Sequence, residues 1–248
     1  MALPKAIADQ YVKTLSGKTI SVTPLIPLLE SGDRLTRAEF ERRYNAMLPH
    51  IRAELIEGVV YMSSPVSHEY HGKPHNRANI LFGWYATQTL GVDCSDNATV
   101  RLDLGNEPQP DLVLFVKPTH GGQLALSAKS YLTGSPELVL EVSSTTVSID
   151  LHSKFQAYRR NNVCEYVIWR VVDRELDWFQ LVNERYERLS PDDNGVIRSH
   201  VFPGLWLDVP ALLNDDISKA FATMQQGLAS KAHAAFAREL KRRAKAKP

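Results

Sequence analysis

The stretch ELVLEVSSTTVSIDLHSKFQAYRR (residues 137–160) places a carboxylate at the end of an apolar run. Residues 138–140 are typical of a strand that is covered on both faces, and Glu141 follows them at once. An unpaired carboxylate in such a place costs free energy, so Glu141 needs a cation or a functional reason to be there. A helical pattern then begins near Asp150.

A second carboxylate, Asp111, follows Pro110 at the start of the preceding apolar run, PDLVLFV (residues 110–116). If the two runs pair as antiparallel neighbours, the start of one meets the end of the other, and Asp111 approaches Glu141 at one edge of the sheet. Two bare carboxylates there repel each other, which raises the pKa of one of them or recruits a cation. Mg²⁺ suits such a place because it accepts a few oxygen ligands and keeps several waters.

A basic residue near this pair would align or deprotonate an attacking water and neutralise phosphate charge. The residue two positions after Glu141 is Ser143, and the next candidate is Lys154 in the helical pattern. Asp150, Lys154 and Tyr158 are spaced four apart, so they share one face of a helix. The loop between strand and helix is long enough for this face to turn back towards Glu141.

The order PQPDLVLFV, PELVLEVSS and SIDLHSKFQAYRRNNVCEYVIWRV resembles the PD-(D/E)xK nuclease superfamily. More narrowly, it resembles the Uma-two family of restriction-endonuclease-like proteins, from about Thr36 to about Val209. The resemblance matches Asp111 to the family's Pro-Asp aspartate and Glu141 to its strand glutamate. It matches Lys154 to a lysine that is displaced from the strand to the following helix.

This resemblance implies a metal-dependent endonuclease that hydrolyses DNA phosphodiester bonds. Asp111 and Glu141 would hold Mg²⁺, or Mn²⁺ as its substitute, with the backbone carbonyl of Val142 as a further ligand. Glu54 and His68 match the family's early acidic position and its histidine, and are expected to support the site, as are Asp150 and Tyr158. An enzyme that cuts two strands by symmetry is expected to be a homodimer.

The expected fold class is α/β (α+β), with a restriction-endonuclease-like core in which helices flank a mixed central sheet. We expect an N-terminal arm over residues 1–35, the restriction-endonuclease-like domain over 36–209 and a C-terminal helical extension over 210–248. The extension ends in the basic run KRRAKAKP, which could contact phosphates or simply be a solvated helix end.

Local signals predict the elements of the N-terminal half. Thr36, followed three residues later by Glu39, is a capping box that opens a short helix. The stretch RAELIEGVVYM (residues 52–62) alternates on both sides of Glu57-Gly58, which predicts a hairpin. A longer helix is expected over residues 68–90, with Ile80, Leu81, Trp84 and Tyr85 on its apolar stripe.

Strands and helices are expected to alternate over the remainder of the chain. Strands are predicted at residues 98–104, 110–116, 137–143, 164–172, 175–182 and 185–189, and residues 196–209 close the β-rich part. Helices are predicted over residues 150–161 and over most of 211–247.

The composition limits the class of protein. The 248 residues are 44% hydrophobic and 23% charged, as in globular proteins rather than disordered ones. The sequence has no signal peptide and no apolar run long enough to span a membrane, so we expect a cytoplasmic protein without a membrane partner. The net charge of +1 means that DNA would have to be bound by a local basic patch.

Two alternatives compete with the endonuclease. The histidines His68, His71 and His75 could form a zinc site on one helix face, although the stretch HEYHG lacks the spacing of the H-E-x-x-H motif and Pro74 complicates the geometry. The chain could also be a catalytically inactive nucleic-acid-binding or interaction module of the same fold. A hydrolase of small phosphoesters is a third reading of the same residues.

Overall fold

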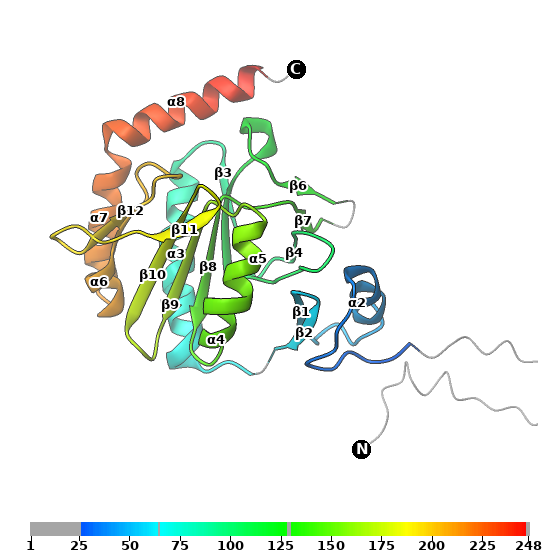
Figure 1. Cartoon of the computed structure of the whole chain (residues 1–248). Helices are drawn as coiled ribbons and strands as arrows, with labels where there is room; N and C mark the ends of the chain where they lie inside the picture. The colour runs from blue at the N-terminus through cyan, green and yellow to red at the C-terminus, as the bar shows by residue number, and fades with distance from the viewer. Residues whose placement is uncertain (1–25, 64, 128–129, 247–248) are drawn as a thin grey trace, which may run out of the picture.

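The computed structural model of the chain describes residues 26–63, 65–127 and 130–246. Its centre is a six-stranded sheet with the strand order β11–β10–β9–β8–β5–β3 (Figure 1). The strands, in chain order, are β3 (Val92–Asp96), β5 (Leu112–Val116), β8 (Leu138–Ser143), β9 (Glu165–Arg170), β10 (Glu175–Val182) and β11 (Arg185–Arg188). Every neighbouring pair is antiparallel except β8 and β9, so the sheet is mixed.

Strands β5 and β8 form the buried centre of the sheet, and all their residues are buried. In their antiparallel register Leu112 lies opposite Leu140, so the beginning of β5 meets the end of β8. The predicted pairing of these two strands is therefore confirmed. It brings Asp111, immediately before β5, to the edge of the sheet where Glu141 lies.

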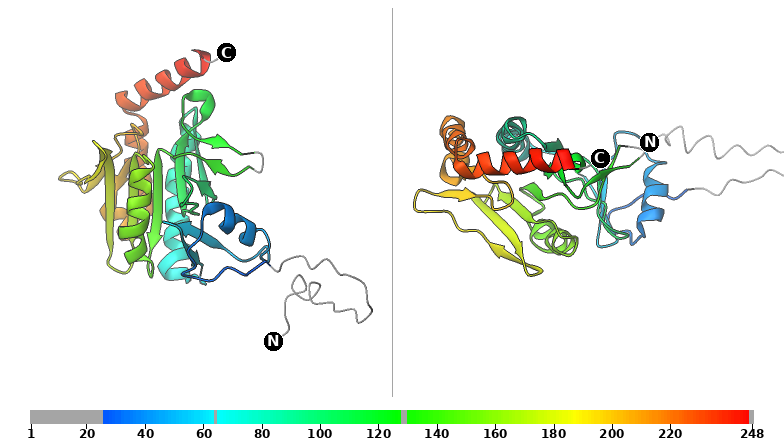
Figure 2. Two further views of the ribbon diagram at one scale, coloured as in Figure 1. Left: turned by 45° about the vertical axis from the view of Figure 1, so that its right-hand side comes forward. Right: turned by 90° about the horizontal axis from the view of Figure 1, so that it is seen from above.

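The parallel connection from β8 to β9 is a helical crossover that covers one face of the sheet (Figure 2). It consists of α4 (Val147–Ile149), a π-helical turn η3 (Asp150–Lys154) and α5 (Phe155–Arg160). Since strand side chains alternate between faces, Val139 and Ile168 pack on this side, against Tyr158 of α5. Glu141, two residues after Val139, faces the same crossover.

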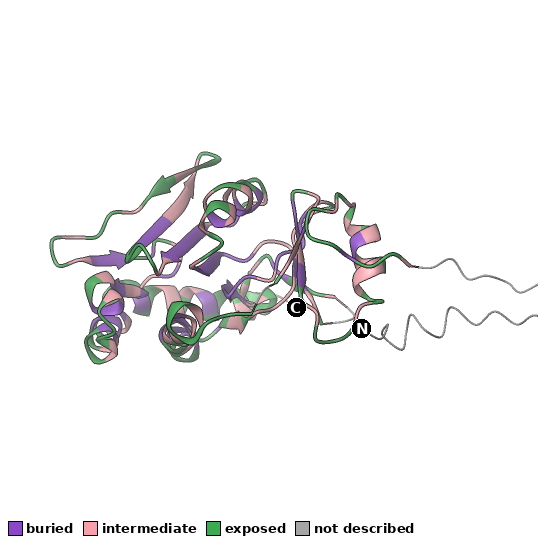
Figure 3. Ribbon diagram, turned by 90° about the horizontal axis from the view of Figure 1, so that it is seen from below, coloured by how far each residue is buried: buried purple, intermediate pink, exposed green. Residues whose placement is uncertain are grey.

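The opposite face carries α3 (Lys73–Gln88), α6 (Val209–Leu213) and α7 (Ile217–Leu228), and α8 (Lys231–Ala246) lies across one end (Figures 1 and 2). Leu81 of α3, Leu140 of β8, Met224 of α7 and Leu240 of α8 belong to one buried cluster. Buried residues accordingly follow the two sides of the sheet (Figure 3). The C-terminal helices thus share the core of the sheet. None of the described helices is both long and apolar enough to cross a bilayer.

The N-terminal half begins with α2 (Arg37–Tyr44), whose capping residue Thr36 accepts a hydrogen bond from the backbone N–H of Glu39. The predicted hairpin is confirmed as β1 (Ala53–Ile56) and β2 (Val59–Met62). Glu57 and Gly58 both have positive φ, as a two-residue turn of this kind requires.

The expected N-terminal arm is only partly within the described residues, because residues 1–25 lie outside them. Within residues 26–35, Leu29 is buried in a small cluster with Phe40, and Arg34 forms an isolated bridge to Val59 of β2. This part of the arm is therefore packed against the hairpin and α2.

The predicted strand over residues 98–104 is too long, because only two of its residues form a strand. Only β4 (Val100–Arg101) is a strand there, because the chain turns at Asp103, whose carboxylate accepts a hydrogen bond from the N–H of Gly105. Leu104 is consequently exposed. The other short elements are β6 (Ala125–Leu126), β7 (Leu132–Thr133), β12 (Val196–Arg198), β13 (Trp206–Asp208) and the 3₁₀ turn η2 (Pro118–His120).

The long helix predicted over residues 68–90 differs from α3 in two ways. A π-helical turn, η1 (His68–Gly72), precedes it, and the α-helix itself begins only at Lys73. Leu81 and Tyr85 are buried as predicted, but Ile80 and Trp84 are exposed. The predicted stripe is therefore too wide, because it includes adjacent residues that lie about 100° apart around the helix axis.

Candidate functional site

Most of the residues that the sequence singles out line one pocket of about 840 Å³, which His68 and Tyr158 do not line. It lies where the end of β8, the start of β5, the hairpin and the two π-helical turns meet. Of the predicted site residues, the pocket is lined by Glu54, Asp111, Glu141, Val142, Asp150 and Lys154.

Glu141 is almost completely buried and is held by two side chains of the crossover. Its Oε1 accepts hydrogen bonds from Lys154 Nζ at 2.9 Å and from the Tyr158 hydroxyl at 2.8 Å. The face of the crossover helix thus does turn back onto the strand, as the spacing predicted. The costly charge at the end of β8 has a cation and a hydroxyl as its partners.

Lys154 is shared among three carboxylates. Besides Glu141, its Nζ lies 3.1 Å from Glu54 Oε2 of the hairpin and 3.8 Å from Asp150 Oδ1. Glu54 is itself fixed, because its Oε1 accepts the backbone N–H of Gln109 at 2.6 Å. Asp150 Oδ2 accepts a hydrogen bond from a threonine hydroxyl, whereas its buried Oδ1 has no hydrogen-bond partner among the described residues.

These contacts set the charge states of the pair. Burial raises the pKa of Glu141, and the neighbouring carboxylates of Asp150 and Asp111 add to this effect against the opposing charge of Lys154. Burial alone would lower the pKa of Lys154, but the charges of the surrounding carboxylates outweigh it and raise that pKa. Lys154 is therefore an ammonium surrounded by the carboxylates of Glu141, Glu54 and Asp150.

Asp111 is held at the edge of the sheet by Val142. Its Oδ2 accepts the backbone N–H of Val142 at 2.7 Å, and its Oδ1 lies 3.2 Å from His71 Nε2. Although burial opposes ionisation, the contact with His71 and the Val142 N–H lower the pKa of Asp111. Asp111 is thus a carboxylate with one oxygen fixed and the other directed at an imidazole.

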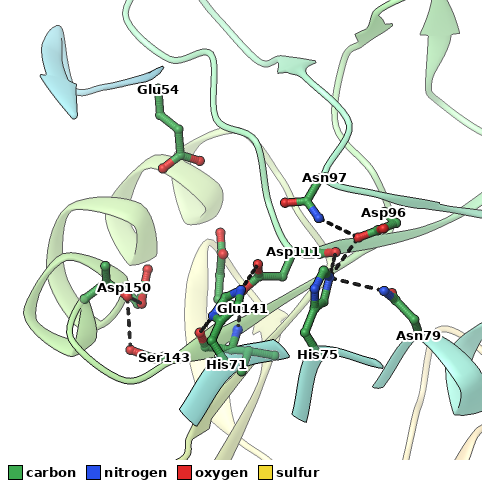
Figure 4. A network of polar contacts seen from close by, with 12 residues as sticks. Glu54, His71, His75, Asn79, Asp96, Asn97, Asp111, Glu141, Ser143 and Asp150 are labelled. Carbon is green, nitrogen blue, oxygen red and sulfur yellow. Dashed lines mark hydrogen bonds and ion pairs between the residues drawn. The ribbon is translucent and has the colours of Figure 1, made fainter. Parts of the chain in front are cut away.

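Two histidines complete the surroundings of Asp111 (Figure 4). His71 of η1 also contacts the carbonyl of Val142 through Nδ1 at 3.1 Å. His75 of α3 has Nε2 at 2.8 Å from the Asp111 carbonyl and at 2.8 Å from Asp96 Oδ1. The zinc alternative drew attention to both histidines, but their association with Asp111 was not predicted. Their four-residue spacing was the available signal.

His68 is not part of this cluster. Its side chain is 78% exposed, and its ion-pair partner is the neighbouring Glu69 at 3.8 Å. It is the first residue of η1, where the turn directs it to solvent while His71 points inward. The expected supporting role of His68 is therefore not supported by its position, and His71 lies where the sequence had suggested His68.

The comparisons with known proteins place the chain in a family. A family model described as "Putative restriction endonuclease", Uma2, matches residues 37–210. The chain belongs to the Uma2 family. The matched segment of this Uma2 protein includes both strands and the crossover that supply the pocket. No curated protein matches the chain.

A solved structure shows the same fold. It is a protein from Anabaena variabilis ATCC 29413, titled "a putative nuclease belonging to DUF820", with a TM-score of 0.51 and 11% sequence identity. The match covers 77% of the present chain and 99% of that protein. The predicted fold class, a restriction-endonuclease-like core with a mixed sheet flanked by helices, is confirmed.

Proposed function

We propose that this Uma2 protein is a Mg²⁺-dependent endonuclease that hydrolyses DNA phosphodiester bonds. The observation that carries the proposal is the meeting of Asp111 and Glu141 at adjoining strand ends, with Lys154 Nζ 2.9 Å from Glu141 Oε1. Two strand-end carboxylates can hold a divalent ion that activates water, and a lysine beside them can offset phosphate charge.

The donor set fits a hard divalent cation. Four carboxylates, those of Glu54, Asp111, Glu141 and Asp150, line the pocket, against the two permanently basic side chains of Lys154 and Arg52 and two histidines. Such an excess of negative charge favours a cation, and Mg²⁺ prefers oxygen ligands. Asp111 and Glu141 would hold the ion, with the Val142 carbonyl as a further ligand once His71 releases it. The bound ion would lower the pKa of a water and stabilise charge on the phosphate.

The roles of the protein's own groups follow from their contacts. Lys154 is protonated and donates to Glu141, so it orients water and offsets phosphate charge but does not accept a proton. Glu54, fixed by Gln109, holds the ammonium from its other side. Tyr158 directs its hydroxyl to Glu141 and so limits the orientations of that carboxylate.

The open sides of the pocket and the residues that line them are consistent with a polymeric substrate. The pocket is open to solvent beside the hairpin, where Arg52 and Tyr61 line its wall, and beside η1, where Tyr70 does so. A cation and aromatic rings of this kind suit a phosphate backbone and exposed bases. The expected homodimer stays a prediction, which the sedimentation behaviour of the purified chain would test.

The test is cleavage of plasmid DNA by the purified chain in Mg²⁺ or Mn²⁺. Glu141→Gln should abolish cleavage while preserving the shape of the residue. The matched control is Glu137→Gln, because Glu137 is also buried, lies just before β8 and accepts the Val116 N–H away from the pocket. Full activity in Glu141→Gln would refute the assignment.

The inactive-module alternative makes a different prediction. Such a protein would bind DNA without cleaving it, and calorimetry with Mn²⁺ would detect no heat that depends on Asp111. A comparison of plasmid DNA with small phosphoesters as substrates distinguishes the endonuclease from a hydrolase of small phosphoesters. Cleavage of the small substrates alone would show that the pocket does not act on a polymer.

A further inference from the structure

His71, His75 and Asp111 form a second group of potential metal ligands at the edge of the pocket. One ligand atom from each lies within 4.8 Å of the other two. His71 and His75 are one helical turn apart, and both side chains project towards Asp111 (Figure 4). The function proposed above uses Asp111 but gives neither imidazole a role.

We propose that His71, His75 and Asp111 bind a divalent transition-metal ion of the Zn²⁺ or Co²⁺ class. This site shares Asp111 with the proposed Mg²⁺ site but takes its other donors from two imidazoles, and it does not depend on nuclease activity. Its nitrogen-rich donor set is the reason, because imidazole suits Zn²⁺, Co²⁺ and Ni²⁺, whereas Mg²⁺ prefers oxygen ligands.

The orientation of His71 is the first argument. A carbonyl oxygen only accepts hydrogen bonds, so the 3.1 Å contact with Val142 requires the proton to be on His71 Nδ1. This leaves Nε2 directed at Asp111 Oδ1. Metal-binding histidines characteristically donate their other ring N–H to a carbonyl or carboxylate in this way, which fixes the tautomer and the ring.

The distance between His71 and Asp111 is the second argument. Two ligands bound at about 2.1 Å from one ion lie about 3.0 Å apart at a 90° angle and about 3.4 Å apart at a tetrahedral angle. His71 Nε2 and Asp111 Oδ1 are 3.2 Å apart, between these two values. A nitrogen lone pair and a carboxylate oxygen repel each other at this distance unless a positive charge lies with them.

That positive charge can be a proton or a metal ion. A proton satisfies only His71 and Asp111. A metal ion would in addition bind His75, once the three ligand atoms, which lie within 4.8 Å of one another, approach to the roughly 3.4 Å that separates tetrahedral ligands at about 2.1 Å.

Two oxygen atoms also lie close to the Nε2 atom of His75. Its Nε2 lies 2.8 Å from both the Asp111 carbonyl and Asp96 Oδ1, which only accept, and 3.2 Å from the side-chain amide nitrogen of Asn79. The Asp96 side chain is 58% exposed and is held by a hydrogen bond from Asn97. Asp96 therefore supplies a carboxylate on the path from solvent, where a fourth ligand or an entering ion would meet it.

Titration of the metal-free full-length chain with Co²⁺ tests the proposal, followed by calorimetry and by the visible absorption of Co²⁺. His71→Ala or His75→Ala should weaken binding by more than about 100-fold, since loss of a residue outside a ligand set already costs about 10–100-fold. His68→Ala is the matched control, because this exposed histidine lies in the same turn, and it should leave Co²⁺ binding unchanged.

Glu141→Gln separates this site from the proposed Mg²⁺ site. This variant should retain Co²⁺ binding while it loses Mg²⁺-dependent cleavage, so the two proposals can fail independently. Equal Co²⁺ affinity in wild type and in the His71→Ala and His75→Ala variants would overturn the inference. So would a Co²⁺ site that is lost in Glu141→Gln and kept in both histidine variants.

A measurement on the wild type does not depend on the variants folding. Addition of Zn²⁺ should shift the ring ¹⁵N resonances of His71 and His75 and leave those of His68 in place. If the resonances of His71 and His75 do not move at saturating Zn²⁺, the imidazoles are not ligands and the proposal fails.

Discussion

Replacement of Lys154 by methionine should lower the stability of the protein, and a second substitution at Glu141 should restore part of the stability without restoring activity. The side chain of Lys154 is 8% exposed, and its ammonium is shared by Glu141, Glu54 and Asp150. Methionine fills similar space but removes the only ammonium from this group. The carboxylates, of which Glu141 and Asp150 are buried, would then repel one another.

The expected loss is large, because removal of one partner from a buried ion pair costs roughly 3–5 kcal/mol. For a chain of this size each kcal/mol lowers the melting temperature by about 2–4 °C, which gives a decrease of about 6–20 °C. The double variant Lys154→Met, Glu141→Gln has one buried carboxylate fewer. It should therefore recover at least about 1 kcal/mol relative to Lys154→Met, although it remains inactive.

The assay is urea unfolding of the wild type, the two single variants and the double variant, in a metal chelator and at one pH. The decisive quantity is the difference between the destabilisation of the double variant and the sum of the destabilisations of the two single variants. If the double variant is as unstable as the sum of the single variants, Glu141 and Lys154 do not interact energetically. The description of the pocket as a lysine that neutralises buried carboxylates would then be wrong.

Three further predictions concern residues around the pocket and beyond it. Tyr158→Phe removes a hydroxyl that donates to Glu141 at 2.8 Å and should cost about 1–2 kcal/mol in unfolding experiments, with slower plasmid cleavage; unchanged values of both would contradict this. Burial, with the nearby carboxyl of Glu41, raises the pKa of Glu107 to about 7 from its usual 4.5. The free energy of folding that the neutral carboxyl contributes is therefore complete below pH 4.5 and is lost as pH rises through about 7. Glu107→Gln should thus be more stable than wild type by about 3 kcal/mol near pH 8, with no difference below pH 4.5. Urea unfolding of both proteins at the two pH values tests this, and a stability difference that is the same at both pH values would contradict it. Thr36→Ala should cost about 1 kcal/mol through loss of the helix cap and leave cleavage unchanged, and a loss of activity in the folded variant would show that α2 does more than pack.

The central sheet could be predicted because its strands carry strong local signals. Residues 112–116 and 138–143 are nearly continuous apolar runs, which strands buried on both faces require. The end of the strand near Val100 could not be predicted from alternation, because the turn depends on the Asp103 side chain and its bond to Gly105. In α3, the choice between Ile80 and Leu81 as the buried residue depends on which neighbours the helix meets.

The site shows the same division. The meeting of Asp111 and Glu141 followed from strand order and an antiparallel pairing, and the reach of Lys154 followed from helical spacing. The choice among the three histidines did not follow, because His71 and His68 differ only in their place within η1. Which of them faces Asp111 is determined by tertiary packing against the end of β8.

The two π-helical turns have a consequence for how this chemistry can be gained or lost. A π turn is geometrically an α-helix with one extra residue, and such turns are frequent at functional sites. Deletion of one residue from η3 would rotate the preceding part of the crossover by about 100° relative to Lys154, although no side chain of the site would be replaced. Relatives of this protein can therefore differ in activity through a single codon inserted or deleted, and an alignment that scores substitutions alone would overlook the change.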